Sequence, residues 1–506
     1  MKLTGFLFAA ALLGSCTQPA AEENYTRHVD PKIGTGGHGH VFVGANVPFG
    51  LVQVGPTSIP QTWDWCSGYH ASDSTVIGFS HTHLSGTGIG DLFDVTVMPV
   101  TGDVTYARGE EADPASGLWS YADRTQEIAR PGYYSVPLTR YGIRAELTAT
   151  ARVGLHRYTF PASDAAAVVF DLENGGCWDK ATETHLAKEG DRTVTGWRHS
   201  TGWAKDQRVY FAAEFSKPFE KFETIGDNYA RASFRTTDGE QVSLKVALSP
   251  VSVEGARENL AAELPGWDFE ETAKAADKAW NDELSKVKIE TADETARRIF
   301  YTALYHTMIA PSLFCDVNGD YYGSDHAIHR NADFTNYTTF SLWDTYRAAM
   351  PLMTVLHPEK MADIVQTMLT ISDEQGRLPV WHLWGNETDC MVGNPGIVAV
   401  ADAIVKGIGG FDREKAFEAI RKTAMNPDRG NGLRMEYGYI PCEMFNEAVA
   451  YDMEYALADG AAACAAETLG KAEDAKYFEE RSHSYRNYFD PATRFMRGRD
   501  SRKGWR

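Results

Sequence analysis

The pattern of apolar residues changes near Pro265 of this 506-residue chain, and that change limits the fold more than any other feature. Before Pro265, apolar and polar side chains alternate, as in the runs from Val209 to Phe215 and from Val242 to Leu248. A period of two is typical of strands that bury one face. Glycine-containing turn sequences separate the runs. Residues 27–265 are therefore predicted to form an antiparallel β-sandwich.

After Pro265 the spacing becomes helical. Residues 266–290 are charged and rich in helix-favouring residues, so they are predicted to form a linker helix. One later helix is expected to bury a stripe at i, i+3, i+4, i+7 and i+8 made of Met361, Ile364, Val365, Met368 and Leu369. A second, alanine-rich helix is expected to bury Val449, Met453, Ala456, Leu457, Gly460 and Cys464. Residues 291–506 are predicted to be antiparallel helical hairpins, the first part of a helical barrel.

The formal charge of −20 at neutral pH argues against a nucleic-acid partner, because such proteins carry basic surfaces. The overall composition, 43% hydrophobic and 23% charged, is that of a globular protein. The charge therefore removes one class of partner without indicating a mechanism.

The first residues are typical of an export signal. Lys2 precedes the apolar run Phe6–Leu13, and Leu13-Gly14-Ser15-Cys16 resembles a bacterial lipobox. Residues 1–16 are predicted to be a lipoprotein signal peptide with lipidation at Cys16, followed by a tether over 17–26. The expected location is the bacterial cell envelope, in the periplasm or at the outer membrane, with the lipid anchor holding the chain to the membrane. The alternative is an ordinary signal peptide.

Six cysteines remain after Cys16, and none has the CxxC spacing of a zinc site. Export would permit disulfides, but six cysteines allow 15 pairings, and the sequence does not choose among them.

The stretch from Phe340 to Gly393 has the densest chemistry. Trp343 and Asp344 are adjacent at the start of an expected helix, and a polar loop with Glu387 and Asp389 follows later. An indole face stacks on the C–H face of a sugar ring while carboxylates accept its hydroxyls. The alternative is that the tryptophans are core residues and the acids cap loops.

Three other segments leave alternatives open. The loop around Trp65 combines aromatic rings, an acid and a histidine, so it is either a buried plug or part of a sugar-binding wall. His81 and His83 share one face of an extended segment, where loop-fixing hydrogen bonds are favoured over a metal site because a third ligand at diagnostic spacing is missing. Asp316, Asn318 and Asp320 alternate like calcium ligands, but a turn is favoured because the glutamate at position twelve is absent.

Four segments together resemble glycoside hydrolase family 92, the calcium-dependent exo-acting α-mannosidases. They are Val29–Gly37, Gly78–Gly86, Phe340–Arg347 and Gly385–Met391. The resemblance implies a β-sandwich packed on an (α/α)6 barrel with the sugar bound between them, in agreement with the independent reading of the periodicity. It also implies inverting hydrolysis of terminal α-linked mannose, with α-1,2 as the expected linkage, in N-glycans or mannan.

The resemblance further implies site residues and a cofactor. Trp343 and Asp344 would line the terminal-mannose pocket, and Trp65 would be the contribution of the N-terminal domain. Glu387 and Asp389 would lie near the pocket. Ca²⁺ would bind the 2- and 3-hydroxyls of the mannose, although its protein ligands remain unknown.

The family's general acid lies in a T-E-G-N-x-W-Q-Y-like segment and its base in a later G-N-D-D-C-G-like segment, and neither occurs in these 506 residues. The chain is therefore expected to be C-terminally truncated and inactive. One alternative makes Asp344 and Glu387 the catalytic pair, which rests only on their aromatic neighbours. The other is a non-catalytic mannan-binding lipoprotein.

Overall fold

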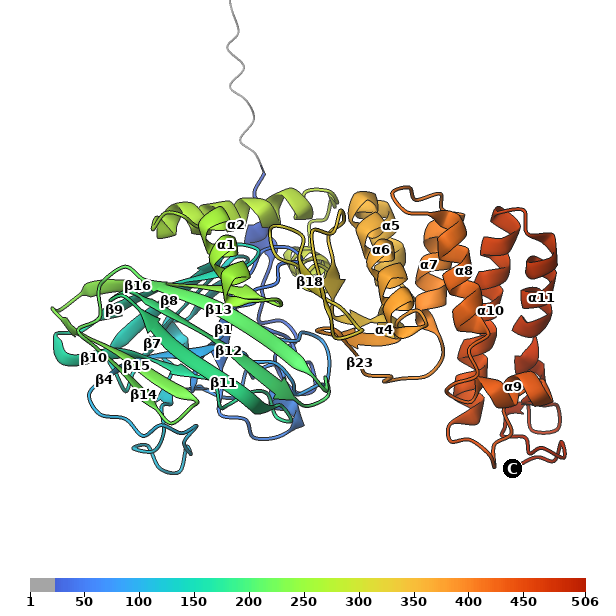
Figure 1. Ribbon diagram of the computed structural model, residues 1–506, viewed down its shortest axis with the longest axis horizontal. Helices are drawn as coiled ribbons and strands as arrows, with labels where there is room; N and C mark the ends of the chain where they lie inside the picture. The colour runs from blue at the N-terminus through green and yellow to red at the C-terminus, as the bar shows by residue number, and fades with distance from the viewer. Residues whose placement is uncertain (1–22) are drawn as a thin grey trace, which may run out of the picture.

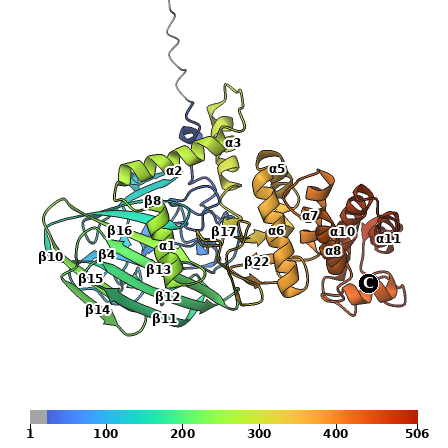
Figure 2. The same cartoon turned by 45° about the horizontal axis from the view of Figure 1, so that its top comes forward.

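The structure is a computed structural model that describes residues 23–506. The expected signal peptide with Cys16, and the tether up to residue 22, lie outside the described residues. Figures 1 and 2 show a β-rich half on one side and a row of helices on the other, with α2 along the top of the β-rich half. In the part of the chain that the structure describes, we find no helix long and apolar enough to span a membrane.

The β-rich half consists mainly of two antiparallel sheets. The eight-stranded sheet has the order β11-β12-β13-β16-β9-β8-β7-β6. Its strands are β6 (Ile128–Arg130), β7 (Tyr133–Leu138), β8 (Ile143–Ala149), β9 (Val153–Phe160), β11 (Lys180–Glu189), β12 (Thr193–Thr201), β13 (Gln207–Phe215) and β16 (Glu240–Ser249). The six-stranded sheet has the order β1-β3-β4-β10-β15-β14. Its strands are β1 (Gly55–Thr57), β3 (Gly78–Ser80), β4 (Thr96–Thr101), β10 (Ser163–Asp171), β14 (Lys221–Ile225) and β15 (Tyr229–Thr236).

The alternation in the sequence places the core of this half. Val209, Phe211, Ala213 and Phe215 of β13 are buried, and so are Val242, Leu244, Val246 and Leu248 of β16. The two strands pair with Phe211 opposite Leu248, so one register serves both apolar sets. The predicted β-sandwich is confirmed.

The helical half begins earlier than Pro265, because α1 starts at Val253. Its helices are α1 (Val253–Glu263), α2 (Phe269–Leu284), α3 (Glu294–His306), α4 (Leu342–Thr345), α5 (Ala349–Leu356), α6 (Pro358–Gln375), α7 (Pro395–Val405), α8 (Arg413–Ala424), α9 (Asn431–Tyr437), α10 (Ala448–Thr468) and α11 (Ala472–Ser482). Four short 3-10 helices are η1 (Thr26–His28), η2 (Trp63–Trp65), η3 (Arg124–Gln126) and η4 (Ser484–Asn487).

Five small sheets complete the described chain. They pair β2 (Thr75–Val76) with β5 (Ser120–Tyr121), β17 (Ser312–Leu313) with β20 (Tyr337–Thr338), β18 (Tyr321–Tyr322) with β19 (Ile328–His329), β22 (Trp381–Leu383) with both β21 (Phe340–Ser341) and β23 (Asn386–Glu387), and β24 (Phe489–Asp490) with β25 (Phe495–Met496).

Helix α6 follows its sequence signals closely. Pro358 occupies its first turn, where the missing N–H costs nothing, and Gly376 ends it with a φ of +94°. The predicted stripe from Met361 to Leu369 is fully buried in the core of the helical half. This prediction is confirmed.

The predicted face of α10 is wrong. Met453, Leu457 and Cys464 are exposed, whereas the buried face has small residues such as Ala462 and Ala466 beside Asp452 and Asp459. Small side chains let α10 pack closely against α7 and α11. The two buried carboxylates are neutralised by Arg434 of α9, whose guanidinium lies 2.7 Å from Asp452 and 2.6 Å from Asp459.

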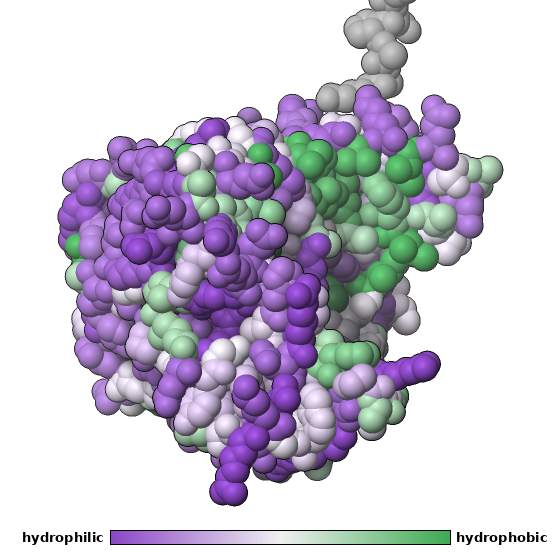
Figure 3. Space-filling model, turned by 90° about the vertical axis from the view of Figure 1, so that its right-hand side faces the viewer, coloured by the Kyte–Doolittle hydropathy of each residue, from purple (hydrophilic) through white to green (hydrophobic). Residues whose placement is uncertain are grey.

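The exposed side of this end of the molecule is mixed in character. Figure 3 views it end-on and shows a largely hydrophilic surface with a hydrophobic area toward its upper right. Large exposed apolar side chains of the last helices and loops include Met435, Met453, Leu457, Phe489 and Phe495.

Part of the helical half packs into the apolar core of the sandwich. Trp381, Leu383 and Trp384, which belong to the helical half by sequence, pack in the same buried cluster as the sandwich strands. Trp203 of the sandwich meets Trp381 edge-on, with ring centroids 4.5 Å apart. Asp206 reinforces this seam, because its backbone exchanges hydrogen bonds with the Asn386 side chain at 3.0 and 2.9 Å.

Candidate functional site

Trp343 and Asp344 lie where β21 ends and α4 begins. The Ser341 hydroxyl donates to Oδ2 of Asp344 at 2.6 Å, and the rest of this exposed carboxylate faces outward. The Nε1–H of Trp343 is buried and has no hydrogen-bond partner. The guanidinium of Arg347 covers one face of the indole, 4.5 Å from a ring centroid. The pair therefore offers an unused donor beside an accessible acceptor.

Glu387 has a different environment. Its largely buried carboxylate accepts backbone N–H groups from Val380 at 2.8 Å, Trp381 at 2.9 Å and Asp389 at 3.0 Å. These bonds hold the hairpin of β22 and β23 to the segment before it. The carboxylate thus satisfies backbone donors that would otherwise be unpaired.

Asp389 extends from the same loop and is half exposed. Its carboxylate pairs with Arg377, and Nε of Arg429 lies 3.5 Å away. Arg429 also donates to the carbonyl of Gly393 at 2.7 Å, which ties the loop to the region before α9. Asp389 is therefore an acid held between two cations.

The two ends of the stretch meet in space. Burial raises the pKa of the Cys390 thiol, and the negative charge of Asp344 adds to that rise. The start of the stretch also pairs with the hairpin, because Ser341 of β21 lies opposite Trp381 of β22. The structure therefore places the strand before Asp344 alongside the β22–β23 hairpin that carries Glu387.

The backbone around these residues is strained. Thr339, Trp384, Asp389 and Met391 all have left-handed φ angles, between +49° and +71°. Each such residue costs on the order of 1–3 kcal/mol, and such residues cluster at functional sites. The strain supports a functional assignment for the stretch Phe340–Gly393.

Trp65, the tryptophan predicted for the N-terminal wall, is already engaged. Its Nε1–H donates to Asp73 at 2.7 Å, and its ring stacks on His70 with centroids 4.2 Å apart. The neighbouring Trp63 is 50% exposed. Its Nε1–H donates to the Gly88 carbonyl at 2.8 Å, and its ring meets the His40 ring in a T-shaped arrangement with centroids 4.2 Å apart.

Trp63 was not among the residues predicted to contact a sugar, although it is the more exposed of the two tryptophans. Two tryptophans flanking one acid in a 3-10 turn cannot point in the same direction, so one of them had to face outward. That spacing was the available signal. Asp64, between them, contacts His38 at 2.5 Å and His40 at 3.4 Å.

The histidines and the calcium-like loop have structural roles. His81 and His83 are buried and bind the carbonyls of Val95 at 2.6 Å and Gln53 at 2.8 Å. Burial lowers the pKa of His81 to about 3 and that of His83 to about 4. The loop-fixing role favoured from the sequence is confirmed.

The carboxylates of the calcium-like loop are likewise occupied. Asp316 contacts Ser249 and Asn259 at 2.8 Å each, and Asp320 pairs with Arg330. The N–H of Gly319 bonds to the carbonyl of Asp316 at 3.0 Å. The segment is the turn favoured from the sequence. The six cysteines in the described residues are all free.

Models of the glycosyl hydrolase family 92 N-terminal domain and catalytic domain match residues 28–249 and 255–506. The chain belongs to glycosyl hydrolase family 92. The resemblance found in the sequence is thereby confirmed, and the order of β-rich and helical domains matches that of solved family members.

The family 92 chain is similar to several solved α-mannosidases. A family 92 α-mannosidase of Bacteroides thetaiotaomicron, solved with mannoimidazole, is 39% identical, with a TM-score of 0.92 over 96% of this chain and 66% of its own. A family 92 inverting mannosidase of the same organism is 28% identical, with a TM-score of 0.86 over 97% of this chain and 68% of its own.

A curated relative is a secreted glycosidase of Arthroderma benhamiae. It is 26% identical over 553 residues, which cover 98% of this chain and 66% of the relative. The chain thus spans about two thirds of the length of the proteins that it matches.

Proposed function

We propose that this chain forms the sandwich and the first barrel helices of an exo-α-mannosidase, which removes terminal α-linked mannose, favouring α-1,2 linkages, from N-glycans or mannan. The unused Nε1–H of Trp343 beside the accessible Asp344 carboxylate carries the proposal. The α-mannosidases among the relatives, one of them solved with mannoimidazole, support it. In this proposal the protein is anchored in the bacterial envelope through Cys16.

In the proposed site, the chain binds and orients the sugar. The face of Trp343 that Arg347 does not cover packs on the C–H face of the ring. Asp344 accepts hydroxyl protons with the oxygen that Ser341 does not occupy. Asp389 and the exposed Trp63 are further candidates for contacts with the glycan.

The reaction that we propose is inverting. An inverting glycosidase needs an acid and a base carboxylate about 6.5–9.5 Å apart, with a water between the base and the sugar. Asp344 and Glu387 are a weak pair for these roles, because Glu387 already accepts three backbone N–H groups. We therefore expect the 506-residue chain to bind mannose without turnover.

Calcium assistance is part of the proposal, but the described residues do not offer a fitting donor set. Calcium takes six to eight oxygen ligands. Within residues 23–506, the one cluster of three candidate side-chain ligands is Asp325, His329 and Glu374, which includes a nitrogen. The proposed mechanism therefore assigns no residue of this chain to calcium binding.

A non-catalytic mannan-binding lipoprotein remains a second proposed function. It is favoured by the same observation, since the strained aromatic–acid stretch can hold a sugar without a catalytic pair.

The test is to express residues 17–506 and measure mannoimidazole binding by calorimetry and hydrolysis of an aryl α-mannoside with calcium. We expect binding that Asp344→Asn weakens by roughly tenfold, equivalent to about 1.4 kcal/mol. Asp373→Asn, an exposed acid on α6, is the matched control and should bind as the parent does. Unchanged binding in Asp344→Asn contradicts the assigned site. Turnover within a hundredfold of a full-length relative contradicts the expected inactivity.

A further inference from the structure

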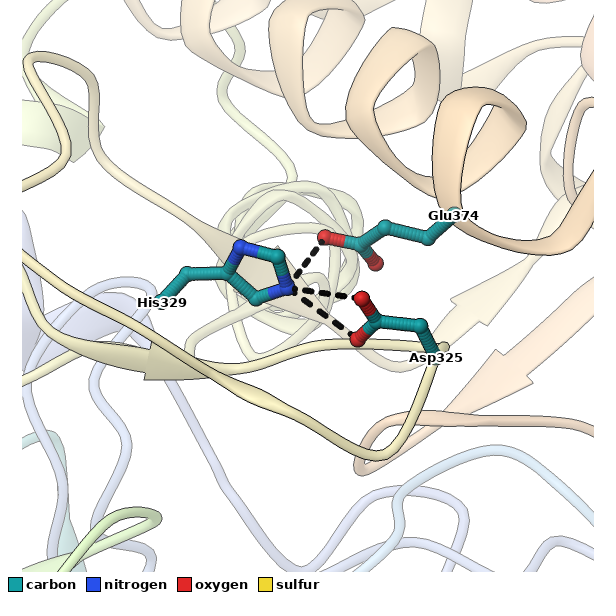
Figure 4. A group of neighbouring side chains, drawn as sticks. All are labelled: Asp325, His329 and Glu374. Carbon is teal, nitrogen blue, oxygen red and sulfur yellow. Dashed lines mark hydrogen bonds and ion pairs between the residues drawn. The ribbon is translucent and has the colours of Figure 1, made fainter.

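A second polar cluster lies outside the proposed sugar-binding residues, where the hairpin of β18 and β19 meets the end of α6. Nε2 of His329 lies 3.1 and 3.2 Å from the two carboxylate oxygens of Asp325 and 3.3 Å from Oε1 of Glu374. Figure 4 shows the three side chains converging from the strand, the hairpin loop and the helix. One ligand atom from each lies within 4.8 Å of the others.

We propose that Asp325, His329 and Glu374 form a binding site for a divalent transition ion of the zinc type. Zinc binds histidine nitrogen at about 2.0–2.1 Å and carboxylate oxygen at about 2.0–2.2 Å. In a tetrahedral site those bond lengths separate neighbouring ligand atoms by roughly 3.3–3.5 Å. The observed separations from His329 are close to that spacing.

The three side chains are held in place by their neighbours. The Tyr321 hydroxyl donates to Oε1 of Glu374 at 3.0 Å, and the N–H of Ser324 donates to Oε2 at 2.7 Å. The ring of Tyr321 stacks on His329 at 4.9 Å with an interplanar angle of 10°. The N–H of Ala327 donates to Asp325 at 3.0 Å. Outer contacts of this kind orient metal ligands before the ion binds.

Gly323 provides a second, independent observation. A Cβ at this position would lie 2.6 Å from Oδ1 of Asp325 and 2.7 Å from Nε2 of His329. Any larger residue would therefore occupy space directly beside two of the proposed ligand atoms. The absence of a side chain at Gly323 keeps that space open.

The charge of the cluster also fits a divalent ion. Two carboxylates face one imidazole, and the Glu374 side chain is only 6% exposed. A divalent ion bound to neutral His329 would neutralise both carboxylates.

The ligand set selects against calcium and leaves a path for entry. Imidazole suits zinc and related ions, whereas calcium prefers oxygen ligands only. The side chains of Asp325 and His329 are each 35% exposed, so an ion can reach them from solvent. The bound ion would join the β18–β19 hairpin to α6.

The experiment uses the 17–506 chain after treatment with EDTA and dialysis. We expect Zn²⁺ to raise the Tm by about 3 °C or more at a hundredfold excess over Kd, with one more bound ion than in His329→Gln. Loss of a direct ligand should weaken this binding by more than the ~10–100-fold that loss of an outer contact costs. Co²⁺ should show the strong visible absorption of a four-coordinate ion, and Ca²⁺ should not replace it.

The matched control is His326→Gln. His326 lies in the same hairpin and bonds to the Tyr322 hydroxyl at 2.8 Å, so it tests for nonspecific histidine binding. It should retain the ion, whereas Asp325→Asn should lose it even if His329→Gln fails to fold. Equal zinc binding by the parent and Asp325→Asn would overturn the proposal, as would a six-coordinate cobalt spectrum in the parent.

Discussion

Trp65 in the sandwich and Trp343 at the start of α4 each lie beside an acidic residue in a turn. The two turns differ in how many of their polar groups are hydrogen-bonded within the protein. In the sandwich, the indole N–H of Trp65 bonds to Asp73, and the ring is stacked on His70. At the start of α4, the indole N–H of Trp343 has no partner, and Asp344 is exposed. Burying a donor without a partner is costly, and a bound ligand is one group that can change its surroundings. The open turn is therefore the better candidate for contact with substrate.

The largest expected effect concerns Glu387, whose carboxylate, like the Trp65 indole, is already hydrogen-bonded within the protein. Glu387→Ala leaves the backbone donors of Val380, Trp381 and Asp389 without their acceptor. We expect a loss of about 3 kcal/mol or more in the free energy of unfolding. Chemical denaturation measures it, with Asp344→Ala as the exposed control that should change stability by less than about 0.5 kcal/mol. Equal losses of stability in the two variants would contradict the distinction between an acid that is hydrogen-bonded within the protein and an acid that is exposed.

Replacing the tryptophans tests the comparison directly. Trp343→Ala should weaken mannoimidazole binding by about 2 kcal/mol, or roughly thirtyfold, because buried aromatic anchors carry much of a binding energy. Trp65→Ala should weaken it less while lowering stability more. Calorimetry and thermal unfolding on both variants measure the two effects. The reverse order would make Trp65 the wall residue.

Asp316 is expected to make a smaller, pH-dependent contribution to the free energy of unfolding. Burial raises the pKa of Asp316 to about 6, although Ser249 and Asn259 donate to it. Because the pKa of this carboxyl group is higher in the folded state than in the unfolded state, the folded state holds the proton more tightly. The free energy of unfolding therefore falls as the pH rises from 4 to 6. The contribution is about 1–3 kcal/mol.

Asp316→Asn should remove this component. The stability of the variant, relative to the parent, should therefore improve between pH 4 and pH 7 by about that amount. Urea denaturation at a series of pH values measures the difference. A parallel pH dependence in the two proteins would show that Asp316 titrates at its ordinary value.

The smallest expected effect is on the open face of α10. Leu457 is 46% exposed, so Leu457→Gln should change the free energy of unfolding by less than about 0.5 kcal/mol. Ala462→Leu, on the buried face, is the contrasting variant and should cost about 1–3 kcal/mol through overpacking. A large loss of stability in Leu457→Gln would instead support the buried stripe predicted from the sequence.

The sequence predicted those parts of the fold that depend on local periodicity. The strands around Phe211 and Val246 and the stripe on α6 were identified because one face of each is apolar. Helix α1 was missed because it is short and polar, and its clearest signal is Ser252, whose side chain accepts the N–H of Gly255. The face of α10 was misassigned because an arginine on another helix makes two buried aspartates tolerable there.

The position and the roles of the site residues remain predictions. The adjacency of Trp343 and Asp344 left two interpretations open, a sugar-binding pair or a core tryptophan beside a loop-capping acid, and the family resemblance favoured the first. The engagement of Glu387 could not be read from the sequence, because its partners depend on how the hairpin of β22 and β23 folds back. Likewise, the spacing of Trp63 and Trp65 showed that two rings diverge but not which one faces solvent.

The tryptophans at the seam limit where this chain can be cut into separate fragments. Trp381 and Trp384 complete an apolar cluster whose other members come from the sandwich strands. A fragment cut near residue 250 would expose its share of that cluster to water and be prone to aggregate. The two family domains are thus separate matches in sequence comparisons, but they share this apolar cluster in the structure. A designer who wishes to exchange one of them must carry the β22–β23 hairpin along with the sandwich.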